Sequence, residues 1–251
     1  MRTVHFHGHI HPAMLKFTMK NHPSLDWHDA EVGDVKFHVL FDSGIIKISC
    51  EVEQFDKALH GYVLYRRALE VSRATADLSG FSLGIELTVI IDKFSEEDRD
   101  PVAIEFRNQS LSNICTACPF GTREFDTVYR LLLETPALMF ALHDLGLALS
   151  RRSHTSASCA RAIEALRDYF VSSVDDRKQG WTKLHANLNV SKDYVKFITD
   201  HSAGPRHGSL VSISAADSTI IFERTWTIMN RFFEFRKHGN IQLSTIDFPV
   251  L

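Results

Sequence analysis

The chain has few of the features that would place it at once in a structural or functional class. Its 251 residues include only four cysteines, too few and too scattered for a disulfide scaffold. No stretch approaches the roughly 18 consecutive apolar residues of a membrane span, and residues 1–20 have no continuous apolar core of the signal-peptide type. We therefore expect a cytoplasmic protein with reduced thiols and no membrane partner.

The sequence also lacks a strong catalytic signature. It contains no glycine-rich phosphate loop, no nucleophile elbow and no paired metal motif. A formal charge of -3 and a pI near 6.5 give no overall attraction for nucleic acid, so any such binding needs a local basic patch. These absences favour a non-catalytic binding or regulatory protein, with RNA or another protein as its partner and no required cofactor.

The composition is that of an ordinary folded protein, with 44 % hydrophobic and 24 % charged residues. The length allows one large domain or two modest ones. The sequence changes character near residue 121, from strand-like to helical patterns. We therefore expect an α+β domain over residues 1–114, a connector over residues 115–121 and a helical bundle domain over residues 122–251.

Strand patterns dominate the first half. Residues 34–53 predict a β-hairpin, because apolar and polar residues alternate on both sides of Asp42-Ser43-Gly44, where glycine supplies a positive φ. Residues 83–94 are rich in β-branched side chains and residues 102–106 form a shorter run, which predicts two further strands. The pattern indicates a mostly antiparallel sheet.

One helix is expected to cross this sheet. Asp56 is placed to cap it, and apolar residues recur at helical spacing as far as about Ser79. Gly80 follows where a helix-terminating glycine is common. The first half thus predicts an α+β layer.

Four histidines alternate near the amino terminus, in a segment predicted to be a strand. Period-two alternation places His5, His7, His9 and His11 on one face, opposite Val4, Phe6 and Ile10. Imidazoles in a row suggest a divalent metal site, adventitious or weak. The alternative is a half-exposed strand whose polar face is histidine.

A Cys-x-x-Cys pair lies between the two halves. Cys115 and Cys118 have the spacing of half a zinc site or of a redox pair, but no second motif follows at finger-like distance. Pro119 and Gly121 indicate a loop rather than the helix start of a redox motif. The alternative to metal binding or redox use is that Cys115 and Cys118 are two ordinary thiols in a connecting segment.

Six helices are expected in the second half, joined by short links. Thr122 is placed to cap the first, and Pro136 fits the first position of the second. The second, over 137–150, is apolar nearly all round and is expected to be the central buried helix. Ser214 and Asp217 resemble a capping box for the last long helix.

The helical half resembles the HEPN superfamily over about residues 122–240. The resemblance is carried by Arg161-Ala-Ile-Glu164 on one helix, a helix bearing Trp181, and Arg206-His207 before a closing helix. It implies a helical bundle that forms a homodimer. In active members, an arginine and a histidine separated by four to six residues promote metal-independent RNA cleavage. Other versions bind RNA or protein partners without cleaving.

The chain departs from that motif, because Arg206 and His207 are adjacent within Gly204-Pro205-Arg206-His207-Gly208, which we expect to form a tight turn. Arg231 and His238 do have the family spacing, at the end of a predicted helix. Arginine and histidine supply a cation for phosphate and a proton-transfer group near neutral pH. Arg206 and His207 are thus candidate catalytic residues, and Arg161, Glu164, Arg231 and His238 are candidate binding residues.

Three hypotheses follow from the sequence. The first is a binding or regulatory protein that contacts RNA or a protein. The second is a HEPN-like ribonuclease of toxin or defence type, acting as a dimer through Arg206 and His207. The third is metal-dependent hydrolysis at His5, His7, His9 and His11.

Overall fold

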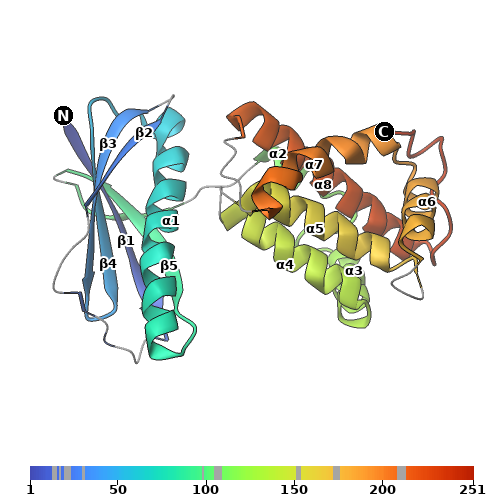
Figure 1. Cartoon of the computed structure of the whole chain (residues 1–251), viewed down its shortest axis with the longest axis horizontal. Coiled ribbons are helices and arrows are strands. Elements are labelled where there is room, and N and C mark those ends of the chain that lie inside the picture. The colour runs from blue at the N-terminus through green and yellow to red at the C-terminus, as the bar shows by residue number, and fades with distance from the viewer. Residues whose placement is uncertain are drawn as a thin grey trace. The chain divides into compact units, whose positions relative to one another are not determined.

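The computed structural model contains an α+β sheet unit followed by a helical unit, which confirms the predicted fold class (Figure 1). It describes residues 1–12, 16, 18–19, 24–29, 32–97, 99–104, 109–150, 154–171, 176–207 and 213–251. Contacts divide the chain into Met1–Arg107 and Asn108–Leu251, a boundary earlier than the expected residue 114. The reason is the short helix α2 (Gln109–Ile114), which packs on the last helix of the second unit and buries Leu111 there.

The sheet unit holds six antiparallel strands in the order β2-β3-β4-β1-β5-β6. Their bounds are β1 Arg2–His11, β2 Ser24–Asp29, β3 Gly33–Asp42, β4 Ile45–Val52, β5 Thr88–Glu96 and β6 Val102–Ala103. The predicted hairpin is confirmed as β3 and β4, with Ser43 at φ 52° and Gly44 at φ 82° in its turn. Positive φ at both positions matches the twist that a two-residue hairpin needs.

Helix α1 (Lys57–Leu83) covers one face of this sheet (Figure 1). Asp56 caps it as expected, accepting hydrogen bonds from the backbone N–H groups of Ala58 and Leu59. The expected end at Gly80 is wrong, because the helix continues to Leu83 and Gly84 ends it at φ 68°. Gly80 lies inside the helix where a Cβ would approach the Ile85 carbonyl oxygen to 2.6 Å. A close packing contact, rather than termination, requires glycine there.

The strand β1 alternates as the sequence predicts. Val4, Phe6 and Ile10 are buried in the core of the unit. The four histidines occupy the other positions, and His5, His7 and His9 are half-buried while His11 is exposed. Because α1 packs on the core side, the histidines belong to the opposite face of the sheet.

Within the described residues, the helical unit contains the six helices expected after residue 121 and, before them, the additional helix α2. After α2 they are α3 Arg123–Glu134, α4 Pro136–Ser150, α5 Thr155–Asp168, α6 Arg177–Leu188, α7 Lys192–Arg206 and α8 Ala215–Lys237. The caps at Thr122 and Ser214 are confirmed, since their side chains accept hydrogen bonds from Phe125 N–H and Asp217 N–H. Local side-chain hydrogen bonds thus set these starts, as the sequence indicates.

The central helix of this unit is α5, not the expected α4. Helix α5 contacts α4, α6, α7 and α8, and its buried residues include Cys159, Ile163 and Leu166. In α4, by contrast, Met139 and Phe140 are 51 % and 66 % exposed. An apolar helix normally occupies the core, so the exposed apolar side chains of α4 mark an unusual surface.

The Gly-Pro-Arg-His segment forms no separate turn. Gly204, Pro205 and Arg206 complete the last turn of α7, and His207 is its C-cap residue. Gly208, the last residue of the expected turn, lies outside the described residues.

The expected connector at residues 115–121 packs within the helical unit instead of separating two domains. Ala117 is fully buried, and its N–H donates to the Asn230 side chain at 2.8 Å. Lys237 donates to the Ala117 carbonyl at 2.9 Å, so both the N–H and the carbonyl of Ala117 are held by α8.

Among the described residues, no single helix is long and apolar enough to cross a membrane, and only α3 with α4 meets these criteria as a pair, bent by 108° at their junction.

Candidate functional site

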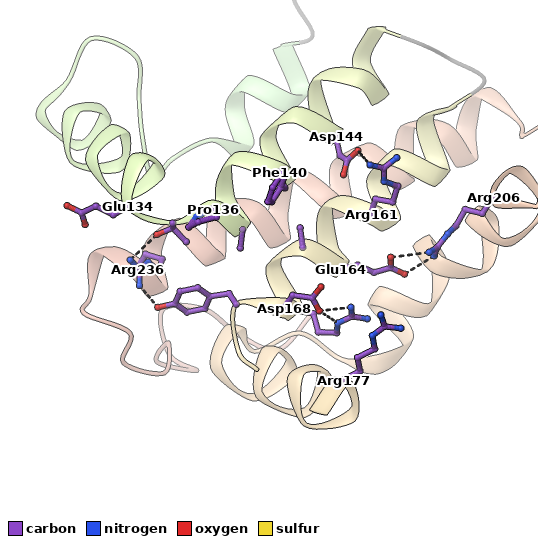
Figure 2. Close-up of a pocket in the computed structure, with 15 residues that line it drawn as sticks. Glu134, Pro136, Phe140, Asp144, Arg161, Glu164, Asp168, Arg177, Arg206 and Arg236 are labelled. Atoms are coloured by element: carbon purple, nitrogen blue, oxygen red, sulfur yellow. Dashed lines mark hydrogen bonds and ion pairs between the residues drawn. The ribbon is translucent and has the colours of Figure 1, made fainter. Parts of the chain in front are cut away.

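The helical unit has an open groove of about 850 Å³ lined by side chains from α3, α4, α5, α6, α7 and α8 (Figure 2). Charged residues dominate the lining, with arginines in excess over carboxylates. The arginines are Arg161, Arg167, Arg177, Arg206 and Arg236, and the carboxylates are Glu134, Asp144, Glu164 and Asp168. The volume falls in the range of about 300–1,000 Å³ that ligand sites occupy.

Arg206 and Glu164 meet across the groove, as Figure 2 shows. The two guanidinium nitrogens Nη1 and Nη2 of Arg206 donate to the two carboxylate oxygens at 2.7 and 3.1 Å. Such a two-bond pair fixes the guanidinium plane and uses only two of its five N–H donors. Two of the residues that the sequence singled out are therefore brought together, with donors of Arg206 left for a ligand.

Asp144 and Arg161 form a second pair of a different kind. Arg161 Nη2 lies 3.3 Å from Asp144 Oδ1, yet Oδ1 is buried and accepts no hydrogen bond from the residues that the structure describes. The Arg161 side chain is 59 % exposed and that of Asp144 only 7 %. Burial raises the pKa of the Asp144 carboxyl, while the Arg161 guanidinium opposes this shift. The contact is electrostatic without good hydrogen-bond geometry, so it holds Arg161 loosely.

Two further arginines are each held by side-chain hydrogen bonds and by an aromatic ring. Arg167 donates twice to Asp168 Oδ1, and its guanidinium lies 5.2 Å from the centre of the Trp181 ring. Arg236 stacks over Tyr169 at 4.9 Å and donates to Thr135 Oγ1 at 3.1 Å, while its buried Nε donates to no acceptor. These contacts orient cationic groups before any ligand arrives.

Arg177 differs from the other four arginines of the groove. It is the first residue of α6 and is exposed. No hydrogen bond or ion pair joins it to a residue that the structure describes, and Figure 2 shows its side chain directed up toward Asp168 and the groove. Its donors are therefore accessible to a ligand.

His207 does not share the groove with Arg206. It is exposed at the end of α7, and its backbone N–H donates to the carbonyls of Gly204 and Pro205. It is not among the residues that line the groove. The helical end of α7 therefore separates the adjacent arginine and histidine instead of presenting them together.

Arg231 and His238 do not form a site together either. Arg231 is buried and donates to the carbonyls of Leu188, Asn189 and Pro249 at 2.7–2.9 Å, which pins the chain end to the end of α6. Burial lowers its pKa. His238 is the C-cap residue of α8, and its Nδ1 lies 2.7 Å from the Glu234 carbonyl. The structure gives Arg231 a tertiary structural contact and His238 a local one.

The histidine strand carries hydrogen-bonded imidazoles. His5 Nδ1 pairs with Ser49 Oγ at 2.9 Å, and His7 Nε2 pairs with Ser95 Oγ at 3.0 Å. Burial, followed by the nearby Lys47, lowers the pKa of both histidines. Within the described ranges, no three His, Cys, Asp or Glu side chains are arranged to hold a metal ion. The arrangement favours neutral imidazoles on a polar sheet face.

The Cys-x-x-Cys pair has no activated thiolate. Cys115 Sγ donates to the Leu111 carbonyl, and both Cys115 and Cys118 are free and half-buried. Burial is the largest effect on each thiol and raises its pKa. Reactive cysteines need a lowered pKa, so this environment is that of structural thiols.

Most of the groove could not be found from the sequence. Arg161, Glu164 and Arg206 were singled out, whereas Asp144, Arg177 and Arg236 were not. Arg167, Asp168 and Arg236 occupy polar positions of helical sequence patterns, and such positions are equally typical of a solvated surface. Only the packing of separate helices reveals that these stripes face one groove.

Comparison with known proteins gives a family without an activity. The model of the N-terminal domain of a domain of unknown function, DUF8168, matches residues 4–104, and the model of its C-terminal domain matches residues 125–237. No curated protein matches the chain, and no solved structure does. The two matched ranges fall inside the sheet unit and the helical unit. The two units thus match, in order, the N-terminal and C-terminal domains of one family, DUF8168, a domain of unknown function.

Proposed function

We propose that the protein is a non-catalytic binding protein whose helical unit holds single-stranded RNA along the arginine groove. The observation that carries the proposal is the convergence of five arginines from four helices on one groove, three of them oriented by side-chain hydrogen bonds. Oriented guanidiniums match the geometry of phosphate oxygens and lose little freedom on binding. The proposal keeps the HEPN-like interpretation of the helical unit, whose non-cleaving versions include RNA binders.

The carboxylates in the groove support the arginines instead of cancelling them. Glu164 takes two N–H groups of Arg206, and Asp168 takes those of Arg167 that point toward it. Each guanidinium retains donors for a ligand. Arg177 and the loosely held Arg161 add cations that a phosphate can recruit without breaking a good hydrogen bond.

RNA accounts for the apolar part of the lining better than an acidic protein segment does. Phe140 lines the groove and is 66 % exposed, a large ring left in water. Grooves that bind single strands combine cations for the backbone with aromatic rings on which bases stack, each stacked base contributing about 1–3 kcal/mol. An acidic peptide would use the arginines and leave the ring without a partner.

Cleavage through Arg206 and His207 has less support from the geometry. A proton-transfer group must come within hydrogen-bond reach of the reacting atom, and His207 is not among the groove residues. Arg206 is paired with Glu164. A binding role uses the arrangement as it stands, whereas cleavage would need a group from elsewhere.

Fluorescence anisotropy with a labelled uridine oligoribonucleotide tests the proposal. We expect Arg177→Ala and Arg161→Ala each to weaken binding, and the slope of log affinity against log salt to fall by about 0.7 for each phosphate that the protein no longer neutralises. Arg123→Ala is the matched control, an exposed arginine of the same unit outside the groove.

The contrary outcomes are distinct. Equal RNA affinity for all three variants would remove the groove from the proposal, and displacement of RNA by polyglutamate at lower concentration would favour an acidic protein partner. The same RNA is followed by gel electrophoresis with a chelator present. Cleavage that is abolished in both Arg206→Ala and His207→Ala would establish the ribonuclease instead.

A further inference from the structure

Phosphate binding does not explain why the carboxylate of Asp144 lies in the groove. It lies on α4 with only 5 % of its surface exposed, and it lines the groove beside the arginines. Its Oδ1 is buried and accepts no hydrogen bond within the described part of the chain. A buried acceptor left without a donor is costly, by about 1–3 kcal/mol, so such an atom in a groove points to a donor supplied by a ligand.

The cation that pairs with this oxygen is not held by a hydrogen bond. Arg161 Nη2 is 3.3 Å away but makes no hydrogen bond to Oδ1. The Arg161 side chain is 59 % exposed and comes from α5, across from Asp144 on α4 (Figure 2). A phosphate in the groove would attract this guanidinium, and its movement would uncover the carboxylate. Phosphate binding and access to Asp144 are thus coupled through one side chain.

An aromatic ring lies one helical turn before Asp144. Phe140 and Asp144 are four residues apart on α4, so their Cβ atoms are about 5–6 Å apart on the same face of the helix. Both line the groove. A planar base stacked on the exposed Phe140 ring would present its edge to the Asp144 carboxylate.

A carboxylate accepts hydrogen bonds and donates none. Guanine presents two adjacent N–H donors, N1–H and the N2 amino group, on its Watson–Crick edge. Adenine and cytosine each place an acceptor nitrogen beside a single amino group, and uracil places carbonyls on both sides of its N–H. The three other bases therefore set a lone pair against one carboxylate oxygen, whereas guanine can satisfy both.

We propose that Phe140 and Asp144 form a guanine-selective base pocket in the arginine groove, with Arg161 moving from Asp144 to a ligand phosphate. The inference rests on the proposed function, because it names the base that the same groove would select. Phe140 supplies stacking to every base, and Asp144 supplies the discrimination.

Isothermal titration of the full chain with 5′-GMP, 5′-AMP, 5′-CMP, 5′-UMP and 5′-IMP tests the pocket. We expect 5′-GMP to bind at least about tenfold more tightly than the other common nucleotides, as a good pair of hydrogen bonds to a base edge provides. Inosine lacks the N2 amino group, so 5′-IMP should fall between 5′-GMP and 5′-AMP. Asp144→Asn should remove the guanine preference, so that the variant binds 5′-GMP no more tightly than it binds 5′-UMP.

The Phe140→Leu variant tests stacking on the ring separately from the selection of guanine. It should weaken all nucleotides by a similar factor, since the ring contacts each base in the same way. Tyr129→Leu is its control, because Tyr129 is an exposed aromatic residue of the same unit outside the groove. Circular dichroism and thermal unfolding confirm that each variant is folded before its titration.

The outcomes separate this inference from the proposed function. RNA binding that depends on Arg161 and Arg177 without a guanine preference would overturn the pocket and leave the RNA proposal standing. A guanine preference that Asp144→Asn removes, without binding of longer RNA, would support the pocket and overturn the RNA proposal. If neither 5′-GMP nor RNA binds, both are overturned.

Discussion

Polar side chains of the sheet unit lie side by side on one face of the sheet, whereas those of the helical unit converge from six helices on one groove. His5, His7 and His9 occupy alternate positions of one strand, so their neighbours are fixed by strand register. The groove arginines are up to 75 positions apart, from Arg161 to Arg236, and meet through helix packing. A flat sheet face disperses functional groups, while crossing helices build a concavity that can surround a ligand.

The two units also differ in their balance of acidic and basic residues. Acidic residues outnumber basic ones in residues 1–107, and basic residues slightly outnumber acidic ones in residues 108–251. The small net charge of the whole chain therefore conceals a local cationic site. Overall charge excludes a strongly basic protein but says nothing of a single groove.

The largest expected effect is that of adding a methyl group in the sheet unit. In Gly8→Ala, the new Cβ would lie 2.0 Å from the Ile90 carbonyl oxygen, so strand β1 or β5 must move. We expect a loss of at least about 3 kcal/mol. Thiol labelling followed by mass spectrometry reports it, because the buried Cys50 belongs to the sheet unit and the buried Cys159 to the helical unit.

A glycine-to-alanine substitution in the helical unit should have the opposite effect on stability. Gly146 lies within α4, and a Cβ there would meet no atom within 4 Å. Gly146→Ala should therefore stabilise that unit by up to about 1 kcal/mol.

Protection of both Cys50 and Cys159 in Gly8→Ala would contradict the packing of β1 against β5, and exposure of both thiols would show that the two units unfold together.

Arg231→Ala should destabilise the helical unit by about 2–4 kcal/mol, because three carbonyls lose a charged donor. Thermal unfolding and the rate of carboxypeptidase digestion measure the effect on the unit and on its chain end. Arg123→Ala is the control. Unchanged stability with weaker RNA binding would instead assign Arg231 the binding role that the sequence resemblance implied.

Asp144→Asn should raise the melting temperature of the helical unit at pH 7, by about 2 °C or more. Burial raises the pKa of Asp144, so the folded state holds its proton more tightly than the unfolded state does. The stability that this residue contributes is present at low pH and is lost as the pH rises through the raised pKa. The difference between variant and wild type should therefore shrink from pH 7 to pH 4, as thermal unfolding at each pH will measure.

A lower melting temperature of Asp144→Asn at pH 7, with a deficit that shrinks on acidification, would show that the pairing with Arg161 outweighs the burial of Asp144. The Glu134→Gln variant is the control, since Glu134 is an exposed carboxylate of the same groove.

The smallest effect on stability is expected from protonation of the histidines on the sheet face. The lowered pKa values of His5 and His7 mean that the folded state favours neutral imidazoles. Their contribution to stability is present above the unfolded value of about 6.5 and is lost as the pH falls through the lower folded values. Acidification from pH 7.5 to pH 5 should raise the labelling rate of Cys50 relative to that of Cys159, by less than about tenfold per histidine, because the loss of thiolate slows both thiols alike.

Replacing both histidines by glutamine should flatten this dependence on pH. Labelling of Cys159 in the helical unit serves as the internal reference, and an equal response of both thiols would contradict a local origin in β1.

Patterns within a few residues were predicted well. The hairpin turn at Ser43 and Gly44, the alternation of β1, and the caps at Asp56 and Thr122 each depend on neighbours close in sequence. The predictions that failed depend on how the chain packs. Gly80 was expected to end a helix, but the close approach of the Ile85 carbonyl, after the chain has turned back, is what requires glycine.

The candidate site could be predicted only in part for the same reason. Arg206 was noticed beside His207, yet its partner is Glu164, 42 positions away. The adjacency that suggested catalysis has no counterpart in the groove, because α7 includes Arg206 in its last turn. A polar stripe on one helix does not reveal which other helix it will face.

The sequence by itself determined the α+β class, the histidine face of β1 and most of the helix starts, because strand periodicity and capping hydrogen bonds act between near neighbours. The tertiary structure alone decided that α5 is central, that α4 leaves Phe140 in water, and that five arginines share a groove with a buried Asp144. Those features arise where helices distant in sequence cross, since burial and electrostatic pairing depend on what packing brings together.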